Sequence, residues 1–152
     1  MFVCHGNICR SPMAEFVMKF FVNKASVANE VYIESSATSR EEIGNGIYPP
    51  AKHVLSLHGI DSTGHRAKQF TVADYNTFDL VVVMEDYNKR NLTRLIGCDC
   101  KGKVWKLLDF VADEPVQGAG NDISDPWYHG NFDKTYNEIM AGCKALMKYL
   151  GY

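Results

Sequence analysis

Apolar positions along the chain follow two patterns, short continuous runs and longer stretches with helical spacing. The short runs predict four strands, of which the valine-rich residues 80–84 most clearly form a strand buried on both faces. The longer stretches predict helices, and the C-terminal one is the clearest because its apolar residues share one face. The predicted strands are residues 1–4, 31–35, 80–84 and 104–107, and the predicted helices begin at Ser11-Pro12 and Pro49-Pro50 and cover residues 88–96 and 136–150.

The order of these elements predicts the fold class. Repeated alternation of strand and helix indicates an α/β domain over residues 1–152, with a four-stranded parallel sheet and helices on both faces. Ligands of such open sheets bind at the carboxyl ends of the strands. Two segments are expected there, namely residues 4–10 after the first strand and the long stretch 109–132 after the fourth.

Composition narrows the class of protein. The 152 residues are 46% hydrophobic and 22% charged, which is typical of a globular domain. A net charge of -2 argues against a dedicated nucleic-acid binder, and no apolar run is long enough for membrane insertion. The first residues lack the pattern of a signal peptide, and five cysteines are an odd number. We therefore expect a cytoplasmic protein with reduced thiols.

The segment between the first strand and the first helix carries the candidate chemistry. It contains, in order, Cys4-His5-Gly6-Asn7-Ile8-Cys9-Arg10-Ser11. A loop that leads into a helix N-terminus points backbone N–H groups at one place, and Gly6 and Asn7 tolerate the left-handed backbone that curls such a loop. Arg10 adds a fork of donors that matches phosphate, and the same positive field stabilises a Cys4 thiolate. The segment therefore predicts a phosphate-binding loop with a nucleophile.

The spacing of Cys4 and Arg10 alone is a weak signal, but the strand before it and the helix after it make it specific. The motif closely resembles that of the low-molecular-weight protein tyrosine phosphatases. The resemblance extends over essentially the whole chain, through residues 33–39, 58–61, 65–69 and 78–84, and Asp125-Pro126-Trp127-Tyr128 is similar to the general-acid loop of that family.

The resemblance implies a role for each site residue. Cys4 would be the nucleophile, Arg10 the phosphate-binding arginine and Asp125 the general acid and base. Ser11 would donate to the thiolate, and Asn7, Ser35 and His65 would brace the loop. Phosphate would be bound by His5, Gly6, Asn7, Ile8, Cys9, Arg10 and Ser11. The substrates would be phosphotyrosine-containing proteins, no cofactor would be required, and the protein would be a monomer or weak dimer.

From the residues alone, the proton donor stays open among Asp109, Asp113, Asp122 and Asp125, and the resemblance selects Asp125. Pro126 biases Asp125 toward an extended backbone. Trp127 and Tyr128 beside it are suited to wall a cleft that accepts a flat phenol.

Some features depart from the family pattern. Arg40-Glu41-Glu42 occupies a stretch where the family often has an aromatic residue, so we expect one acidic wall of the substrate cleft, with Glu41 on it. Met1 lies only three residues before Cys4, which leaves open whether residues precede it.

The remaining cysteines and histidines receive separate interpretations. A loop curled around one phosphate brings Cys9 close to Cys4, which favours a reversible disulfide between them. Cys98-Asp99-Cys100 is interpreted as a surface turn and Cys143 as a core residue. Histidines 5, 53, 58 and 129 show no ligand-like clustering, so no metal site is predicted.

Two alternative functions remain. An arsenate reductase on the same fold would attack arsenic with Cys4 and relay a disulfide through Cys98, Cys100 or Cys9. A non-catalytic phosphate-binding module would need neither a nucleophile nor an acid.

Overall fold

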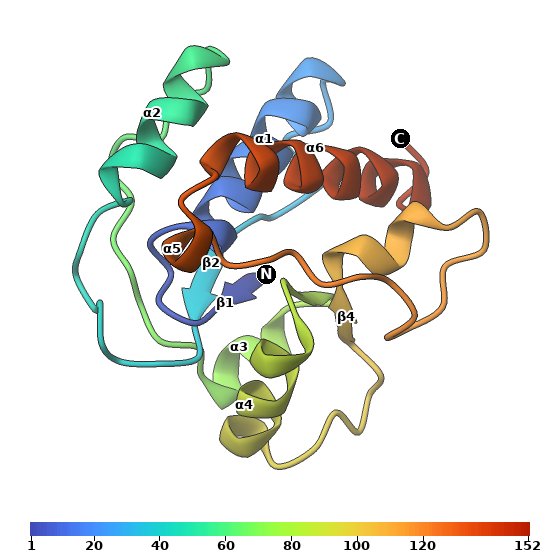
Figure 1. Ribbon diagram of the computed structural model, residues 1–152. Helices are drawn as coiled ribbons and strands as arrows, with labels where there is room; N and C mark the ends of the chain where they lie inside the picture. The colour runs from blue at the N-terminus through green and yellow to red at the C-terminus, as the bar shows by residue number, and fades with distance from the viewer.

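The computed structural model describes residues 1–152 and contains a parallel sheet between two layers of helices (Figure 1). The strands are β1 (Phe2–Cys4), β2 (Ser35–Ala37), β3 (Val81–Val83) and β4 (Val104–Lys106), in the order β2-β1-β3-β4. All neighbouring strands are parallel, with Phe2 beside Ser35 and Val82, and Val82 beside Trp105. The predicted α/β class and four-stranded parallel sheet are confirmed.

Helices cover both faces of the sheet, as the buried side chains of its strands show. Phe2, Cys4 and Val82 pack in a core formed with α1 (Arg10–Lys24), α2 (Pro49–Leu57) and α6 (Phe132–Tyr149). The alternate residues Val3, Val81 and Val83 pack in a second, smaller core with residues of α3 (Val72–Thr77) and α4 (Asp86–Ile96). Since successive strand residues point to opposite faces, continuous apolar runs are what a sheet covered on both sides requires.

The C-terminal helix α6 packs across α1 and against the segment that follows β4. That segment begins with a 3₁₀-helix, η1 (Leu107–Val111), and continues as a loop to α5 (Pro126–His129). Gly142 allows the close approach, because a Cβ there would lie 2.5 Å from Cγ of Leu107. No helix is long and apolar enough to cross a membrane.

The second strand differs from its prediction. Val31 and Ile33 suggested a strand over residues 31–35, but β2 lies at Ser35–Ala37. The amide of Phe2 donates to the carbonyl of Glu34 (2.9 Å), so the ladder with β1 begins there and residues 31–33 have no neighbour to pair with. The prediction also omitted α3, which Thr71 and Asp74 begin with a capping box.

Candidate active site

The loop between β1 and α1 forms the floor of the site. Three of its carbonyl oxygens accept from neighbours outside the loop: Cys4 O accepts from the amide of Thr38 (2.9 Å), His5 O from Ser39 (3.0 Å) and Ile8 O from Tyr48 (2.8 Å). Asn7 has the left-handed backbone expected for this position, with φ of 58°. With the carbonyls directed outward, the concave side of the loop presents amides at the N-terminus of a 15-residue helix, which suits an anion.

Cys4 is the last residue of β1, and its sulfur points into this concavity. The side chain is buried, and Sγ lies 3.0 Å from the Ser11 hydroxyl and 3.3 Å from the backbone nitrogen of Asn7. Both groups can donate a hydrogen bond to sulfur. The structure therefore brings Cys4 and Ser11 together, in the arrangement that the resemblance implies.

Arg10 lies beside Cys4 with its guanidinium buried. It donates to the carbonyl of Ile123 (3.0 Å), and it pairs with Glu85 (2.9 Å) and Asp125 (2.8 Å). Burial alone would lower the pKa of Arg10, but the negative groups around it outweigh burial and raise that pKa above its usual value. The guanidinium thus stays charged although it is out of the solvent.

Glu85 was missed by sequence reasoning. It lies two residues after the end of β3 and immediately before α4, so it is on the carboxyl rim next to the β1 loop. The only signal for it in the sequence was an acidic residue immediately after the valine-rich strand.

Asp125 lies where the predicted acid should be. It lines the same pocket as Cys4, and Oδ2 accepts from Arg10 while Oδ1 accepts from the amide of Trp127 (3.0 Å). The second contact caps α5 and fixes the carboxylate at the mouth of the loop.

The other aspartates have different surroundings. Asp109 is buried and accepts from the amides of Lys106, Gly118 and Gly120 at 2.6–2.8 Å, so it shapes the long loop from within. Asp122 pairs with Lys106 (3.1 Å). Asp113 is exposed, and none of the three lines the pocket of Cys4.

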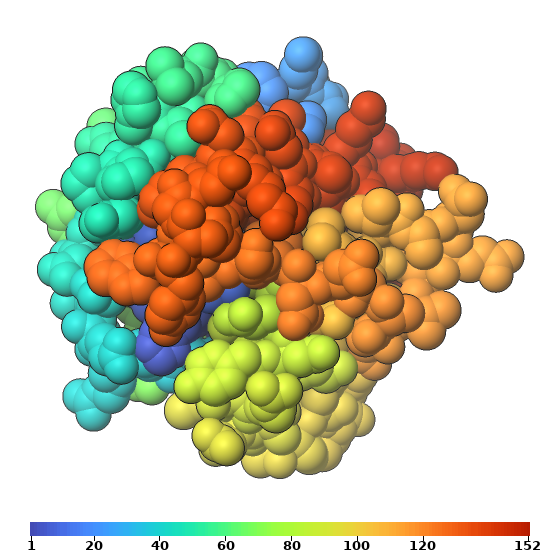
Figure 2. Space-filling model, in the orientation of Figure 1, coloured from blue at the N-terminus to red at the C-terminus, as the bar shows by residue number.

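The pocket above the loop has a volume of about 170 Å³, and the space-filling view shows the N-terminal loop recessed between the Asp125 segment, α4 and the segment after β2 (Figure 2). Trp127 and Tyr128 line one side and are largely exposed. The Trp127 ring packs 5.0 Å from that of Tyr48. Glu41 and Glu42 also line the pocket, on the side where an acidic wall was expected, and so does His5.

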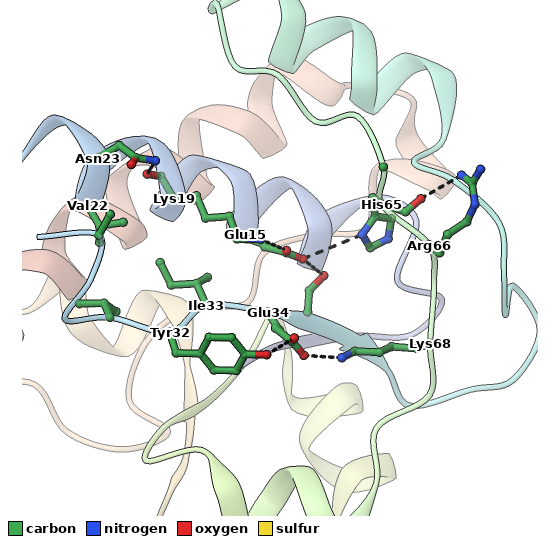
Figure 3. Close-up of a pocket in the computed structure, with 14 residues that line it drawn as sticks. Glu15, Lys19, Val22, Asn23, Tyr32, Ile33, Glu34, His65, Arg66 and Lys68 are labelled. Carbon is green, nitrogen blue, oxygen red and sulfur yellow. Dashed lines mark hydrogen bonds and ion pairs between the residues drawn. The ribbon is translucent and has the colours of Figure 1, made fainter. Parts of the chain in front are cut away.

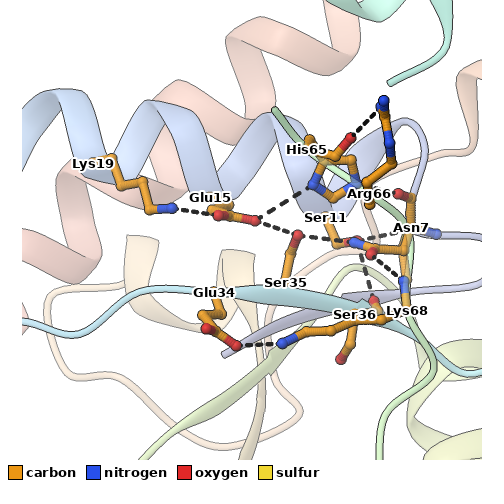
Figure 4. Close-up of polar contacts among 11 residues, drawn as sticks. Asn7, Ser11, Glu15, Lys19, Glu34, Ser35, Ser36, His65, Arg66 and Lys68 are labelled. Atoms are coloured by element: carbon orange, nitrogen blue, oxygen red, sulfur yellow. Dashed lines mark hydrogen bonds and ion pairs between the residues drawn. The ribbon is translucent and has the colours of Figure 1, made fainter. Parts of the chain in front are cut away.

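A chain of polar contacts braces the loop from behind (Figure 4). The Asn7 side chain donates to Ser11 Oγ (2.9 Å) and Ser35 Oγ (2.8 Å), and the amide of Lys68 donates to its oxygen (3.1 Å). His65 Nε2 contacts the carbonyl of Asn7 (2.8 Å). Asn7, Ser11, Ser35 and His65 are thus assembled around one point.

Glu15 extends this network and was not predicted. Its carboxylate accepts from Ser35 Oγ and Lys19 Nζ, both at 2.5 Å, and lies 3.9 Å from Nδ1 of His65. Behind it opens a wider pocket of about 610 Å³ between α1, the segment before β2 and residues 64–68 (Figure 3). No cysteine lines that pocket, so it does not compete as the catalytic site.

The cysteines other than Cys4 divide into two groups. Cys9 and Cys143 are buried free thiols, and burial raises the pKa of Cys9 to about 12. Cys98 and Cys100 form a disulfide, so the expectation that all five thiols are reduced is wrong for this pair. The turn before β4 holds their Cα atoms 5.3 Å apart, which is within bonding reach. No three His, Cys, Asp or Glu side chains are grouped so as to hold a metal ion.

Comparisons with known proteins give relatives over the full length. The family model described as low molecular weight phosphotyrosine protein phosphatase matches residues 1–152. The protein-tyrosine-phosphatase YfkJ of Bacillus subtilis is 32% identical over 147 residues, covering 97% of this chain and 92% of YfkJ. The low molecular weight phosphotyrosine protein phosphatase of Gallus gallus is 37% identical over 153 residues, with the same coverage.

Solved structures are also similar to this chain over nearly its whole length. The crystal structure of YfkJ superposes with a TM-score of 0.90 at 31% identity, covering 99% of this chain and 92% of that one. Vibrio vulnificus Wzb in complex with benzylphosphonate has a TM-score of 0.82 at 26% identity, covering 97% of this chain and 95% of that one.

Proposed function

The chain belongs to the low molecular weight phosphotyrosine protein phosphatase family, and from this premise we propose that it hydrolyses phosphotyrosine in proteins through a phosphocysteine intermediate on Cys4. The observation that carries the proposal is the meeting of Cys4, Arg10 and Asp125 around one pocket. A nucleophile, a cation and a proton donor are the three groups that transfer of a phosphoryl group to cysteine requires.

In the first proposed step the phosphate enters the loop, where the amides and Arg10 bind its oxygens. Arg10 then exchanges its pairing with Asp125 for the phosphate, and the freed Asp125 carboxylate takes up a proton from solvent. The Cys4 thiolate attacks phosphorus in line, the bond from phosphorus to the phenolic oxygen breaks, and Asp125 gives its proton to that oxygen. Ser11, at 3.0 Å from Sγ, donates to the sulfur when it carries negative charge.

In the second proposed step Asp125, now a carboxylate, takes a proton from water. The oxygen of that water attacks phosphorus and the bond to sulfur breaks, which returns the Cys4 thiolate and releases inorganic phosphate. The loop amides and Arg10 supply positive charge throughout, so this mechanism needs no metal or organic cofactor. The substrate class is supported by the exposed Trp127 and Tyr128, which offer a flat wall for a phenol.

The arsenate reductase alternative requires a cysteine relay from Cys4 to an exchange partner. Cys98 and Cys100 precede β4 and lie at the amino end of the parallel sheet, whereas Cys4 ends β1 at the carboxyl end. Such a separation favours the phosphatase. A non-catalytic phosphate-binding module would have no use for Cys4 and Asp125 in one pocket.

The test is hydrolysis of p-nitrophenyl phosphate and of a phosphotyrosyl peptide in excess EDTA, compared with thiol-dependent reduction of arsenate. Phosphate release from both substrates without metal is expected. Arsenate reduction without phosphate release would contradict the proposal, and sedimentation of the active protein would test the predicted monomer or weak dimer.

A further inference from the structure

The mouth of the catalytic pocket carries two glutamates with different exposure. The side chain of Glu41 is 70% exposed, and both Glu41 and Glu42 line the pocket of Cys4. Glu42 is half-buried, it packs against Gly6, and its Oε2 accepts from Asn45 (2.6 Å). Glu41 is therefore the carboxylate available to a bound substrate.

The backbone fixes Glu41 beside the phosphate-binding loop. The hydrogen bonds from Thr38 to Cys4 and from Ser39 to His5 continue the pairing of β2 and β1 beyond the strands. The amide of Glu41 then donates to the hydroxyl of Ser39 (3.4 Å). The carboxylate is thus carried on a segment tied to the same loop that holds the phosphate.

The charge of Glu41 is only partly balanced by other groups of the protein. Its Oε2 lies 3.0 Å from Nε2 of His5, and Oε1 has no protein partner. The His5 ring is the one protein group that contacts this carboxylate. The cation of this pocket, Arg10, already pairs with Asp125 and Glu85, and Arg40 does not line the pocket. The mouth therefore presents negative charge.

We propose that Glu41 gives this phosphatase a preference for phosphotyrosine flanked by lysine or arginine, an inference that rests on the proposed function. When the phosphate lies in the loop and the ring lies against Trp127, the peptide on either side of the phosphotyrosine leaves through the mouth. A lysine or arginine there meets Glu41, whereas an acidic residue meets a like charge. An exposed pair of this kind is worth about a two- to fivefold difference in kcat/KM.

The experiment uses three phosphopeptides that differ only in the residues on both sides of the phosphotyrosine, which are lysine, glutamine or glutamate. The expected order of kcat/KM is lysine, then glutamine, then glutamate, and the spread should shrink as salt is added because the charges are exposed. Glu41→Gln should make kcat/KM nearly equal for the lysine and glutamate peptides, and Glu41→Lys should reverse the preference. Glu114→Gln, at an exposed glutamate outside the pocket, should keep the wild-type ratio.

Hydrolysis of p-nitrophenyl phosphate by the wild-type protein tests the proposed function separately from the role of Glu41, since this substrate has no flanking residues. An enzyme that hydrolyses it but cleaves the three peptides equally overturns the role of Glu41. A preference that persists in Glu41→Gln overturns it as well. A protein inactive toward every substrate overturns the proposed function and this inference with it.

Discussion

Replacement of Asn7 by alanine should both destabilise the protein and disable the phosphate-binding loop. The Asn7 side chain makes three hydrogen bonds, to Ser11, Ser35 and the amide of Lys68, and it is fully buried. Its backbone is left-handed, which asparagine tolerates and alanine does not. One substitution therefore removes the bracing and strains the turn together.

The expected magnitude follows from these contacts. Three buried hydrogen bonds at about 1 kcal/mol each predict a loss of about 3 kcal/mol in the free energy of unfolding. The left-handed backbone of alanine adds about 1 kcal/mol. Asn7→Ala should therefore lose about 4 kcal/mol, and Asn7→Gly, which is free of the backbone strain, about 3 kcal/mol.

The assay is urea denaturation of the wild type and both variants, read as midpoint and slope, with kcat/KM for p-nitrophenyl phosphate measured in parallel. Both variants should lose at least about tenfold in kcat/KM, because the loop amides no longer converge on the phosphate. Asn23→Ala is the matched control. Asn23 lies on α1 and makes one exposed hydrogen bond to the carbonyl of Lys19, so its loss should stay within about 0.5 kcal/mol.

Two results would refute this reasoning. A loss below about 1 kcal/mol for Asn7→Ala would mean that these hydrogen bonds do not hold the loop. A large loss of stability with unchanged kcat/KM would mean that they hold the fold but not the geometry of the site.

Three further predictions concern the groups proposed to be catalytic. Cys4→Ser should abolish turnover yet still bind phosphate in calorimetry. Arg10→Lys should lose nearly all activity, because an ammonium group cannot replace the forked donors of the guanidinium. Activity of either variant within tenfold of wild type would contradict the roles of nucleophile and phosphate ligand. Asp125→Asn, which keeps the cap on Trp127, should lower kcat on phenyl phosphate by about 100-fold or more and by less for acidic phenols; an equal loss for all leaving groups would make Asp125 structural. Peroxide should inactivate the enzyme through a Cys4–Cys9 disulfide that dithiothreitol reverses. Because burial raises the pKa of Cys9 to about 12, that disulfide should form faster as pH rises. Peptide mapping that finds over-oxidised Cys4 and free Cys9 would refute this prediction.

Local sequence patterns were sufficient to predict the helices and strands that are determined by their own residues. The valine-rich β3 and the amphipathic α6 lie where their periodicity placed them, within a few residues. The helix α1 begins at Arg10, one residue before the predicted Ser11, and Pro12 is tolerated in its first turn, where amides lack helical partners. The β2 shift arose because pairing with β1, and not the alternation of Val31 and Ile33, decides which residues form the strand.

The site was predictable only in part, for a similar reason. Residues 4–11 are contiguous, so their spacing and their resemblance to a known family identified them together. Glu85 is far from that motif in sequence, and only the order of the strands brings it to Arg10. Glu15 follows the motif closely on α1, but its partner Ser35 is distant in sequence, and only the packing of α1 on β2 brings the two together. No local signal links residue 85 to residue 10.

The central position of β1 has a consequence for how the enzyme is made. β1 is the first strand to be synthesised, but its neighbours β2 and β3 are made much later, and α6, which covers α1, comes last. Contacts between segments so far apart in sequence form slowly, because a long loop must close before they are gained. On the ribosome the loop that carries Cys4 is therefore expected to complete its contacts only after most of the chain has emerged. Nascent fragments that lack α6 should carry Cys4 without the finished pocket, so we expect activity only when synthesis is nearly complete.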